Sequence, residues 1–336
     1  MTRTITRRSA SLGLLLGLPG CATLAHLPPH GAVAAVARPP DGEFVMEDGA
    51  RLPYRAWLPP DGLPPDIVVL GLHGFNDSRD AWEVPAPEFQ RAGIAIFSPD
   101  QRGFGEAPDR GRWAGTTRMA DDAAEIARTL RARFPDARLI LMGESMGGAV
   151  LMCAATMPVP PPADGYVLIA PAVWGRAQMG ILLSSGLWIV ASVAPGWRVT
   201  GAEVPIRIRP SDNRAALLAL ARDPLTINRT RFDTLRGLTN AMDAAQAAAP
   251  DFRAPALFLY GGQDRLVPPE ATLALWRKLP EGARRALYPH GYHLLLRDKD
   301  RAKPIDDILA WIRHPGAPLP SGADHAAGAW LGQQGV

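Results

Sequence analysis

The chain has 336 residues, of which 47% are hydrophobic and 21% are charged, so it is long enough for one large folded domain and is not disordered as a whole. Its 36 basic and 33 acidic side chains give a formal net charge of +3, and Arg3, Arg7 and Arg8 account for all of this excess. The rest of the chain is neutral in sum, which argues against a nucleic-acid partner.

Residues 1–20 have the layout of a secretory signal, with a basic end, a short apolar stretch and small residues before Cys21. The apolar stretch is too short to span a bilayer by itself. The sequence from Leu18 to Cys21 resembles a bacterial lipoprotein processing site, although Pro19 departs from the usual small residue, and "TRRSASL" resembles a loose twin-arginine export signal. We therefore expect an exported protein, lipid-anchored through Cys21 to a bacterial membrane and facing the periplasm or the cell exterior. A simple cleaved signal or a disordered N-terminus is the alternative.

Residues 21–40 are rich in proline and alanine and predict a tether. The folded body then begins with two short strand-like runs between Gly42 and Pro59, which meet at Asp48 and Gly49 in a hairpin pattern. Five apolar runs of strand length follow, and each ends in Gly, Pro, Asp or His: "DIVVLGLHG", "GIAIFSPDQRGFG", "ARLILMGESMGG", "GYVLIAPAV" and "APALFLYGGQD".

Helical patterns separate these runs, and the clearest extends from Arg118 to Phe134. Alternating strands and helices predict an α/β fold with a doubly wound, mostly parallel sheet. In such sheets ligands lie beyond the carboxyl ends of the strands. The residues that fall at this edge are His73, Asp100, Ser145 and Asp264.

The alternation stops between about Trp174 and Pro250, which predicts a helical cap inserted between two parts of the core. We set the first part of the core at residues 41–171, the cap (lid) at 172–249 and the second part of the core at 250–314. Met179 to Pro195 is 17 residues without a charge, which suits a buried or lipid-touching lid helix better than a membrane span. Residues 315–336 lack periodicity, so we expect a disordered tail.

The motif "GESMG" places Ser145 between Gly143 and Gly147, directly after an apolar strand and before an apolar helix. This is the context of a nucleophile elbow, a strand-to-helix turn so tight that the flanking positions exclude side chains. Ser145 is thus a candidate nucleophile, and a serine that only caps the helix is the alternative.

A serine hydroxyl becomes a good nucleophile only when a base removes its proton and an acid orients that base. Asp264 follows an apolar strand and His293 follows a turn at Gly291, and the order Ser145, Asp264, His293 is the order of α/β-hydrolases. The competitors that we consider less suitable are His290 among the bases and Asp243 and Asp251 among the acids.

The oxyanion formed by such a reaction needs backbone donors. Gly74 lets the chain after its strand approach the nucleophile, so the amides of Phe75 and Met146 are the predicted donors. His73 is expected to support this loop, and a role as a second base is the alternative. The seven histidines show no metal-ligand spacing and no phosphate-binding motif is present, so neither a metal nor another cofactor is expected.

Taken together, these motifs resemble the α/β-hydrolases of the monoacylglycerol lipase and lysophospholipase type. The pieces that match are "LHGFNDSRDAW", "SPDQRGFGEA", "GESMGG", "DPL" at Asp223–Leu225, "GGQDRLVPPE" and "GYHLLL". The resemblance implies a cap over an acyl pocket and ester hydrolysis without a cofactor. Glu106 departs from the family's small hydroxyl residue, and the lid segment matches least.

The leading hypothesis is a serine hydrolase that cleaves carboxylic esters of monoacyl lipids, a small-molecule acyl ester substrate, through an acyl-enzyme on Ser145. Leu183, Leu187 and Trp188 are the predicted acyl-pocket or lid residues. The alternatives are an esterase, thioesterase, peptidase or acyltransferase for another acyl group, or a lipid-binding protein on an inactive scaffold. The sequence does not predict an oligomeric state.

Overall fold

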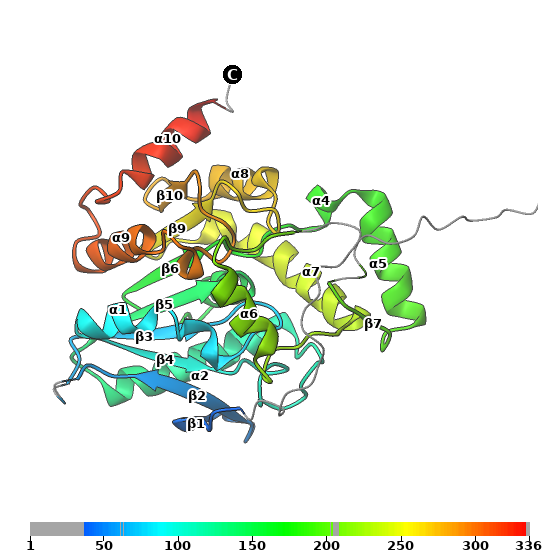
Figure 1. The fold of residues 1–336 in the computed structure, drawn as a ribbon, viewed down its shortest axis with the longest axis horizontal. Helices are drawn as coiled ribbons and strands as arrows, with labels where there is room; N and C mark the ends of the chain where they lie inside the picture. Colours follow the sequence, from blue (N-terminus) through cyan, green and yellow to red (C-terminus); the bar gives the residue numbers. More distant parts are fainter. Residues whose placement is uncertain (1–36, 61, 63, 202, 204–207, 334–336) are drawn as a thin grey trace, which may run out of the picture. The chain divides into compact units, whose positions relative to one another are not determined.

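The computed structural model describes residues 37–60, 62, 64–201, 203 and 208–333 (Figure 1). The predicted signal of residues 1–20, Cys21 and the tether up to residue 36 lie outside this part of the chain. The described residues form a central eight-stranded sheet with the strand order β1-β2-β4-β3-β5-β6-β9-β10. A separate two-stranded ribbon pairs β7 (Arg198–Val199) with β8 (Thr230–Arg231).

The sheet is antiparallel only at one edge. There β1 (Gly42–Val45) and β2 (Arg51–Trp57) form the predicted hairpin, and β2 pairs antiparallel with β4. All other pairings are parallel. The parallel strands are β3 (Ile67–Leu72), β4 (Ile94–Pro99), β5 (Arg138–Glu144), β6 (Gly165–Ile169), β9 (Ala256–Gly261) and β10 (Arg284–Tyr288). Their carboxyl ends therefore meet at one edge, as expected for an α/β fold.

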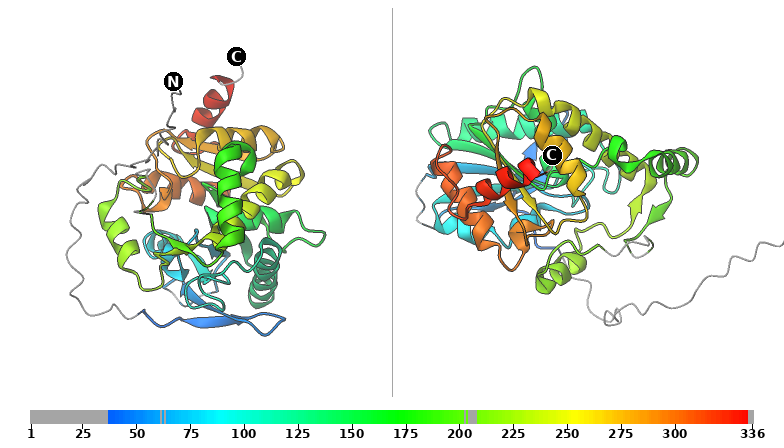
Figure 2. Two further views of the ribbon diagram at one scale, coloured as in Figure 1. Left: turned by 90° about the vertical axis from the view of Figure 1, so that its right-hand side faces the viewer. Right: turned by 90° about the horizontal axis from the view of Figure 1, so that it is seen from above.

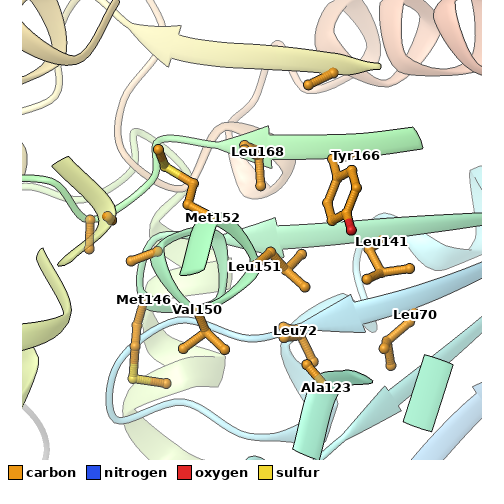
Figure 3. Close-up of a cluster of buried hydrophobic side chains, with 14 of the residues drawn as sticks. Leu70, Leu72, Ala123, Leu141, Met146, Val150, Leu151, Met152, Tyr166 and Leu168 are labelled. Carbon is orange, nitrogen blue, oxygen red and sulfur yellow. The ribbon is translucent and has the colours of Figure 1, made fainter. Parts of the chain in front are cut away.

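Successive residues of each central strand pack into two different cores because side chains alternate across a sheet. Leu70 and Leu141 lie in one core, while Val69 and Ile140 lie in the other. Figure 3 shows the first core, where Leu70, Leu72 and Leu141 lie close to helix residues such as Val150 and Leu151. Both faces are covered, which explains why these strands read as continuous apolar runs.

The first face carries α2 (Thr116–Arg133), α3 (Met146–Ala155), α7 (Phe232–Ala248) and α8 (Pro269–Lys278). The second face carries the 3₁₀ turn η1 (Arg79–Trp82), α1 (Ala86–Arg91) and α9 (Ala302–Arg313). Two further 3₁₀ turns, η2 (Ala249–Asp251) and η3 (Leu295–Arg297), lie after α7 and after β10. The helical layers thus hold the strand ends, and the loops that follow them, in fixed positions.

The region predicted as a cap divides into two parts. Helices α4 (Arg176–Met179), α5 (Ile181–Val193) and α6 (Arg214–Arg222), together with the β7–β8 ribbon, stand apart from the central sheet, and Figure 2 shows α5 at the margin beside α7. Helix α7, which fills the end of the predicted cap, packs on α2 and α3 instead. The protruding part of the insertion therefore ends before α7.

Helix α5 buries only Ala191 among its 13 residues. Within the described part of the chain, no helix combines the length and the apolar character that a membrane crossing requires. The uncharged segment predicted as a lid helix is therefore a helix with an exposed apolar surface, on which Leu182 is 92% and Trp188 59% exposed.

The expectation of a disordered tail over residues 315–336 is wrong for its central part, where α10 runs from Ala323 to Gln333. This helix lies against β10, which is the edge strand next to β9 in the sheet of the described residues. Trp330 stacks on Tyr260 with ring centroids 5.6 Å apart and meets Trp276 edge-on. Covering an unpaired edge and burying aromatic surface stabilise a helix whose own sequence shows little periodicity.

Candidate active site

Ser145 forms the turn between β5 and α3, with φ 51° and ψ −112°. A non-glycine residue at positive φ is strained, and the surrounding packing must hold it there. A side chain at Gly143 would place its Cβ 2.5 Å from the carbonyl carbon of Gly147, and one at Gly147 would approach the carbonyl oxygen of Leu72 to 2.4 Å. Both glycines are therefore required by space. The turn is further fixed because the Ser145 amide donates to the carbonyl of Ile169 (2.9 Å).

Asp264 and His293 lie together at the same edge of the sheet, after β9 and after β10. Nδ1 of His293 lies 2.7 Å from Oδ2 of Asp264, and both side chains are buried. Oδ1 of Asp264 accepts from the amides of Leu266 (2.8 Å) and Val267 (3.0 Å), which fixes the carboxylate's orientation. Burial alone would lower the pKa of His293, but the charge and hydrogen bond of Asp264 outweigh it and the pKa is raised.

Ser145 and His293 border one cavity of about 270 Å³. Apolar side chains make up most of its wall. They come from the start of the insertion, the segment before α6, α6, α7 and the loops after β9 and β10: Ala172, Pro210, Leu220, Leu238, Met242, Leu266, Val267 and Leu294. Two larger cavities, of about 510 and 490 Å³, are lined by residues of the C-terminal third and, in one of them, by Asp212, and include neither Ser145 nor His293.

The predicted pocket residues Leu183, Leu187 and Trp188 do not border this cavity. They lie on α5, whose side chains face away from the core. They were predicted from their apolar character, but α5 packs on α7 along one side only and leaves Leu183 and Trp188 exposed. The apolar wall instead comes from Leu220, Leu238 and Met242, whose helices α6 and α7 show weaker apolar runs in the sequence.

The predicted oxyanion donors flank Ser145. Phe75 and Gly74 border the cavity, and Met146 is the first residue of α3, so its amide has no acceptor inside the helix. An added Cβ at Gly74 would lie 3.6 Å from Cβ of Ser145, which is ordinary contact. Gly74 therefore brings the loop close to Ser145, but space alone does not demand a glycine there.

His73 is fully buried, and both of its ring nitrogens are engaged. Nδ1 lies 2.7 Å from the carbonyl oxygen of Gly74 and must carry the proton, while Nε2 accepts from the amide of Gln101 (3.0 Å). Burial lowers the pKa of His73 and so favours this neutral form. The ring thus connects the Gly74 loop to the loop after β4, which is the supporting arrangement expected from the sequence.

The competing residues lie elsewhere. His290 is exposed, and Asp251 is exposed in η2. The carboxylate of Asp243 binds the guanidinium and the amide of Arg176. Glu106, the residue that departs from the family pattern, accepts from Nη2 of Arg79 (2.8 Å), whose Nη1 binds the buried Asp100. Its charge therefore has a local partner, which explains why a carboxylate is tolerated there.

Sequence reasoning missed a buried group of charges next to the site. Nη2 of Arg297 lies 2.5 Å from Oδ2 of Asp77 and 3.0 Å from Oε1 of Glu144, and all three side chains are buried. Glu144 immediately precedes Ser145 inside the motif itself, and a charged residue at the end of an otherwise apolar strand was the available signal.

This sheet, with a strained serine after β5, an acid after β9 and a histidine after β10, defines an α/β-hydrolase of the serine hydrolase class. Residues 64–300 match the family model described as "Serine aminopeptidase, S33". The match covers more than half of the chain, which therefore belongs to this family.

Relatives agree with this assignment. Monoglyceride lipase from Rattus norvegicus is 24% identical over 282 residues, which are 81% of this chain and 89% of the relative. An uncharacterized abhydrolase domain-containing protein from Dictyostelium discoideum is 22% identical over 80% of this chain, but the match spans only 28% of that longer protein. Among solved structures, a soluble variant of monoglyceride lipase from Saccharomyces cerevisiae with a substrate analog has a TM-score of 0.68 at 18% identity, covering 85% of this chain and 98% of that one.

Proposed function

We propose that this protein hydrolyses esters of monoacyl lipids, with monoacylglycerols as the preferred substrates, through an acyl-enzyme on Ser145. The coarser class, carboxylic ester hydrolase, follows from the family and from the monoglyceride lipase relatives. One observation carries the proposal: Ser145 at its strained turn shares an apolar cavity with an imidazole whose other nitrogen is bonded to a buried carboxylate.

In the proposed mechanism Nδ1 of His293 keeps its proton and donates a hydrogen bond to Asp264, which leaves Nε2 as the acceptor for the Ser145 proton. Ser145 Oγ attacks the ester carbonyl, and the amides of Phe75 and Met146 stabilise the oxyanion. The imidazolium then protonates the departing alcohol, and a water molecule deprotonated by His293 hydrolyses the acyl-enzyme. Asp264 holds the imidazole in the required tautomer throughout.

The cavity wall supports a lipid-type substrate with a neutral leaving group. Its apolar part, with Leu220, Leu238 and Met242, suits an acyl chain. Asp77 and Glu144 supply carboxylates to the wall, and no lysine or arginine is among the described residues that border the cavity. An anionic phosphate group would meet like charge there, so we favour glyceryl esters over phosphate-bearing lysophospholipids.

The test is a substrate profile. Initial rates are compared for monoacylglycerol, lysophospholipid and nitrophenyl esters of matched chain length, with Ser145→Ala as the background control. We expect monoacylglycerol turnover to exceed lysophospholipid turnover at equal chain length, and Ser145→Ala to lower turnover roughly a millionfold and to abolish fluorophosphonate labelling. Near-normal turnover by Ser145→Ala would refute the nucleophile. Preferred cleavage of aminoacyl anilides, which the family description allows, would refute the substrate class.

The location of the enzyme is a second part of the proposal. The signal pattern before Cys21 supports export and lipid anchoring to a bacterial membrane, and the exposed apolar surface of α5 supports work at a lipid surface. Cys21→Ala should move the protein from the membrane fraction to the soluble fraction, as measured by fractionation and immunoblotting. An unchanged membrane fraction would contradict the anchor.

A further inference from the structure

Arg297, Asp77 and Glu144, the carboxylate–guanidinium cluster, connect three different loops of the candidate site. Asp77 lies two residues after Phe75 in the loop that follows β3, and Glu144 is the last residue of β5, next to Ser145. Arg297 ends the 3₁₀ turn η3, four residues after His293. A single nitrogen, Nη2, contacts both carboxylates, at 2.5 Å and 3.0 Å. One side chain thus joins the loop of the proposed oxyanion donor, the elbow and the segment that follows the proposed base.

The cluster is buried, so each of its charges must keep its partner within contact distance. Exposed ion pairs contribute little, but a buried charge that loses its partner is strongly destabilising. The loop cannot therefore move away from the elbow without leaving Asp77 or Glu144 unpaired in a low dielectric. Asp77 is held further because its Oδ1 accepts from the amide of Ser78 (2.8 Å). The cluster therefore restrains the relative positions of the three loops.

The charges of the cluster also act on His293. The groups that face the imidazole are Asp264 from the loop after β9, Glu144 from β5 and Arg297 from η3, and Asp77 and Asp298 in turn face Glu144. Burial lowers the pKa of His293, whereas Asp264 and then Glu144 raise it and Arg297 lowers it. Burial raises the pKa of Glu144 itself, and Arg297 opposes this. Asp77 and Glu144 share the single guanidinium of Arg297, so removing any one of these three charges changes the electrostatic potential at His293.

We propose that Arg297 and Glu144 are positioning residues: Arg297, paired with both Asp77 and Glu144, fixes the Phe75 loop against the elbow, and the two residues place opposite charges beside the His293 imidazole. This inference rests on the proposed roles of Ser145, His293 and Phe75, and it goes beyond them because neither Arg297 nor Glu144 exchanges a proton with the substrate. The strained backbone of Ser145 is set by the elbow and does not depend on the cluster. The cluster instead fixes the relative positions of the neighbouring loops and places charges near His293.

The first experiment follows the His293 imidazole signal by NMR as a function of pH in the intact protein, with the signal assigned through His293→Ala. Glu144→Gln keeps the shape of the side chain and removes its charge, so the titration midpoint of His293 should move to lower pH. Arg297→Gln removes the opposing charge and should move the midpoint to higher pH. Opposite shifts from the two partners of one ion pair cannot come from general loosening of the fold.

The matched control is Glu125→Gln, because Glu125 is also a buried glutamate paired with an arginine, Arg118, but lies on α2 away from the cavity. It should leave the His293 titration unchanged. If Arg297→Gln does not fold, Glu144→Gln alone decides. An unchanged midpoint in Glu144→Gln, or a midpoint moved to higher pH, overturns the electrostatic part of the proposal.

The second experiment measures the rate of fluorophosphonate labelling of Ser145 against pH. In Glu144→Gln the rate at pH 6, relative to the plateau at high pH, should rise roughly two- to fivefold because less of His293 is protonated. The plateau itself should fall at least tenfold in Arg297→Gln and less in Arg297→Lys, since lysine retains the charge but carries it on a more flexible stem. A plateau equal to wild type in Arg297→Gln overturns the positioning role. The NMR titration does not require turnover of a substrate. It therefore tests the effect of Glu144 and Arg297 on His293 even if the proposed substrate class is wrong.

Discussion

At the scale of single residues, two histidines three positions apart in the sequence have very different surroundings. His293 is buried against Asp264 at the cavity, while His290 is exposed. We therefore expect His293→Ala to lower kcat/KM on an ester substrate by several orders of magnitude, roughly as much as loss of the nucleophile. His290→Ala should stay within about twofold of wild type, because an exposed ring makes no comparable contact. The reverse ranking would assign the base to His290.

The acid can be tested in the same way. Asp264→Asn should lower kcat roughly 10⁴-fold, because an amide can stabilise the wrong imidazole tautomer. The matched control is Asp243→Asn, which removes a partly exposed ion pair with Arg176 whose two residues do not border the cavity. Steady-state rates on a nitrophenyl ester report both variants. A larger loss in Asp243→Asn would place the acid on α7.

The pH dependence of the reaction follows from the same pair. His293, the proposed base, can accept a proton only when neutral; burial lowers its pKa, but Asp264 raises it and the net shift is upward. The value of kcat/KM should therefore fall as the pH drops, with a midpoint above the ordinary imidazole value of about 6.5. In Asp264→Asn the midpoint of the residual activity should move to lower pH. A wild-type midpoint below that of free imidazole would show that burial outweighs the carboxylate.

The sequence predicted some of these residues and not others, for physical reasons. The position of Ser145 follows from a local requirement, since Gly143 and Gly147 are needed wherever such a turn is built. The ion pair between Arg297 and Glu144 joins residues 153 positions apart, and no local pattern reports such a contact. The residues that form the cavity wall were likewise not predicted, because apolar residues are common along the chain. Which of them line the cavity beside Ser145 depends on the tertiary fold.

At the scale of elements, the strands were predictable because each is buried on both faces and reads as an apolar run. The end of the insertion was not. Helix α7 follows it without a break in the sequence pattern, and only its packing on α3 shows that it belongs to the helical layer. Helix α10 was missed because its alanines and glycines show no clear apolar period, while its stability comes from tertiary contacts.

Helix α10 gives a prediction about stability. Trp330 is its main aromatic contact, stacked on Tyr260 and edge-on to Trp276. Trp330→Ala should lower the free energy of unfolding by about 2 kcal/mol, because it removes half-buried aromatic surface and two ring contacts. Urea unfolding followed by circular dichroism measures this loss. The control is His325→Ala, at an exposed position on the same helix, which should leave the unfolding midpoint unchanged. Equal losses of stability in the two variants would show that the ring contacts of Trp330 do not hold α10 in place.

At the scale of the whole molecule, the central question is how an enzyme with a small cavity would reach the monoacyl lipids of the proposed function, which aggregate in water. The family match over residues 64–300 establishes the class of protein but does not describe this step. Most of the large apolar side chains of α5 are exposed, and an apolar surface of this kind on a folded chain marks a contact with lipid or protein. In the proposed function that contact is the surface of the substrate aggregate.

Replacing Leu182 and Trp188 together with serine tests this contact. Leu182 is 92% and Trp188 59% exposed, so the change removes apolar surface without opening the core, whereas the half-buried Leu187 would also disturb packing on the folded body. Activity on aggregated long-chain monoacylglycerol should fall about tenfold or more, because each large side chain withdrawn from an apolar phase forfeits roughly 1.5–3 kcal/mol of binding. Activity on short soluble esters should stay near wild type, since neither residue borders the cavity.

Val159→Ser, at a position 72% exposed in the loop after α3, is the control and should change neither rate. Equal losses on both substrate classes would show that α5 supports the fold of the site and does not bind the lipid surface.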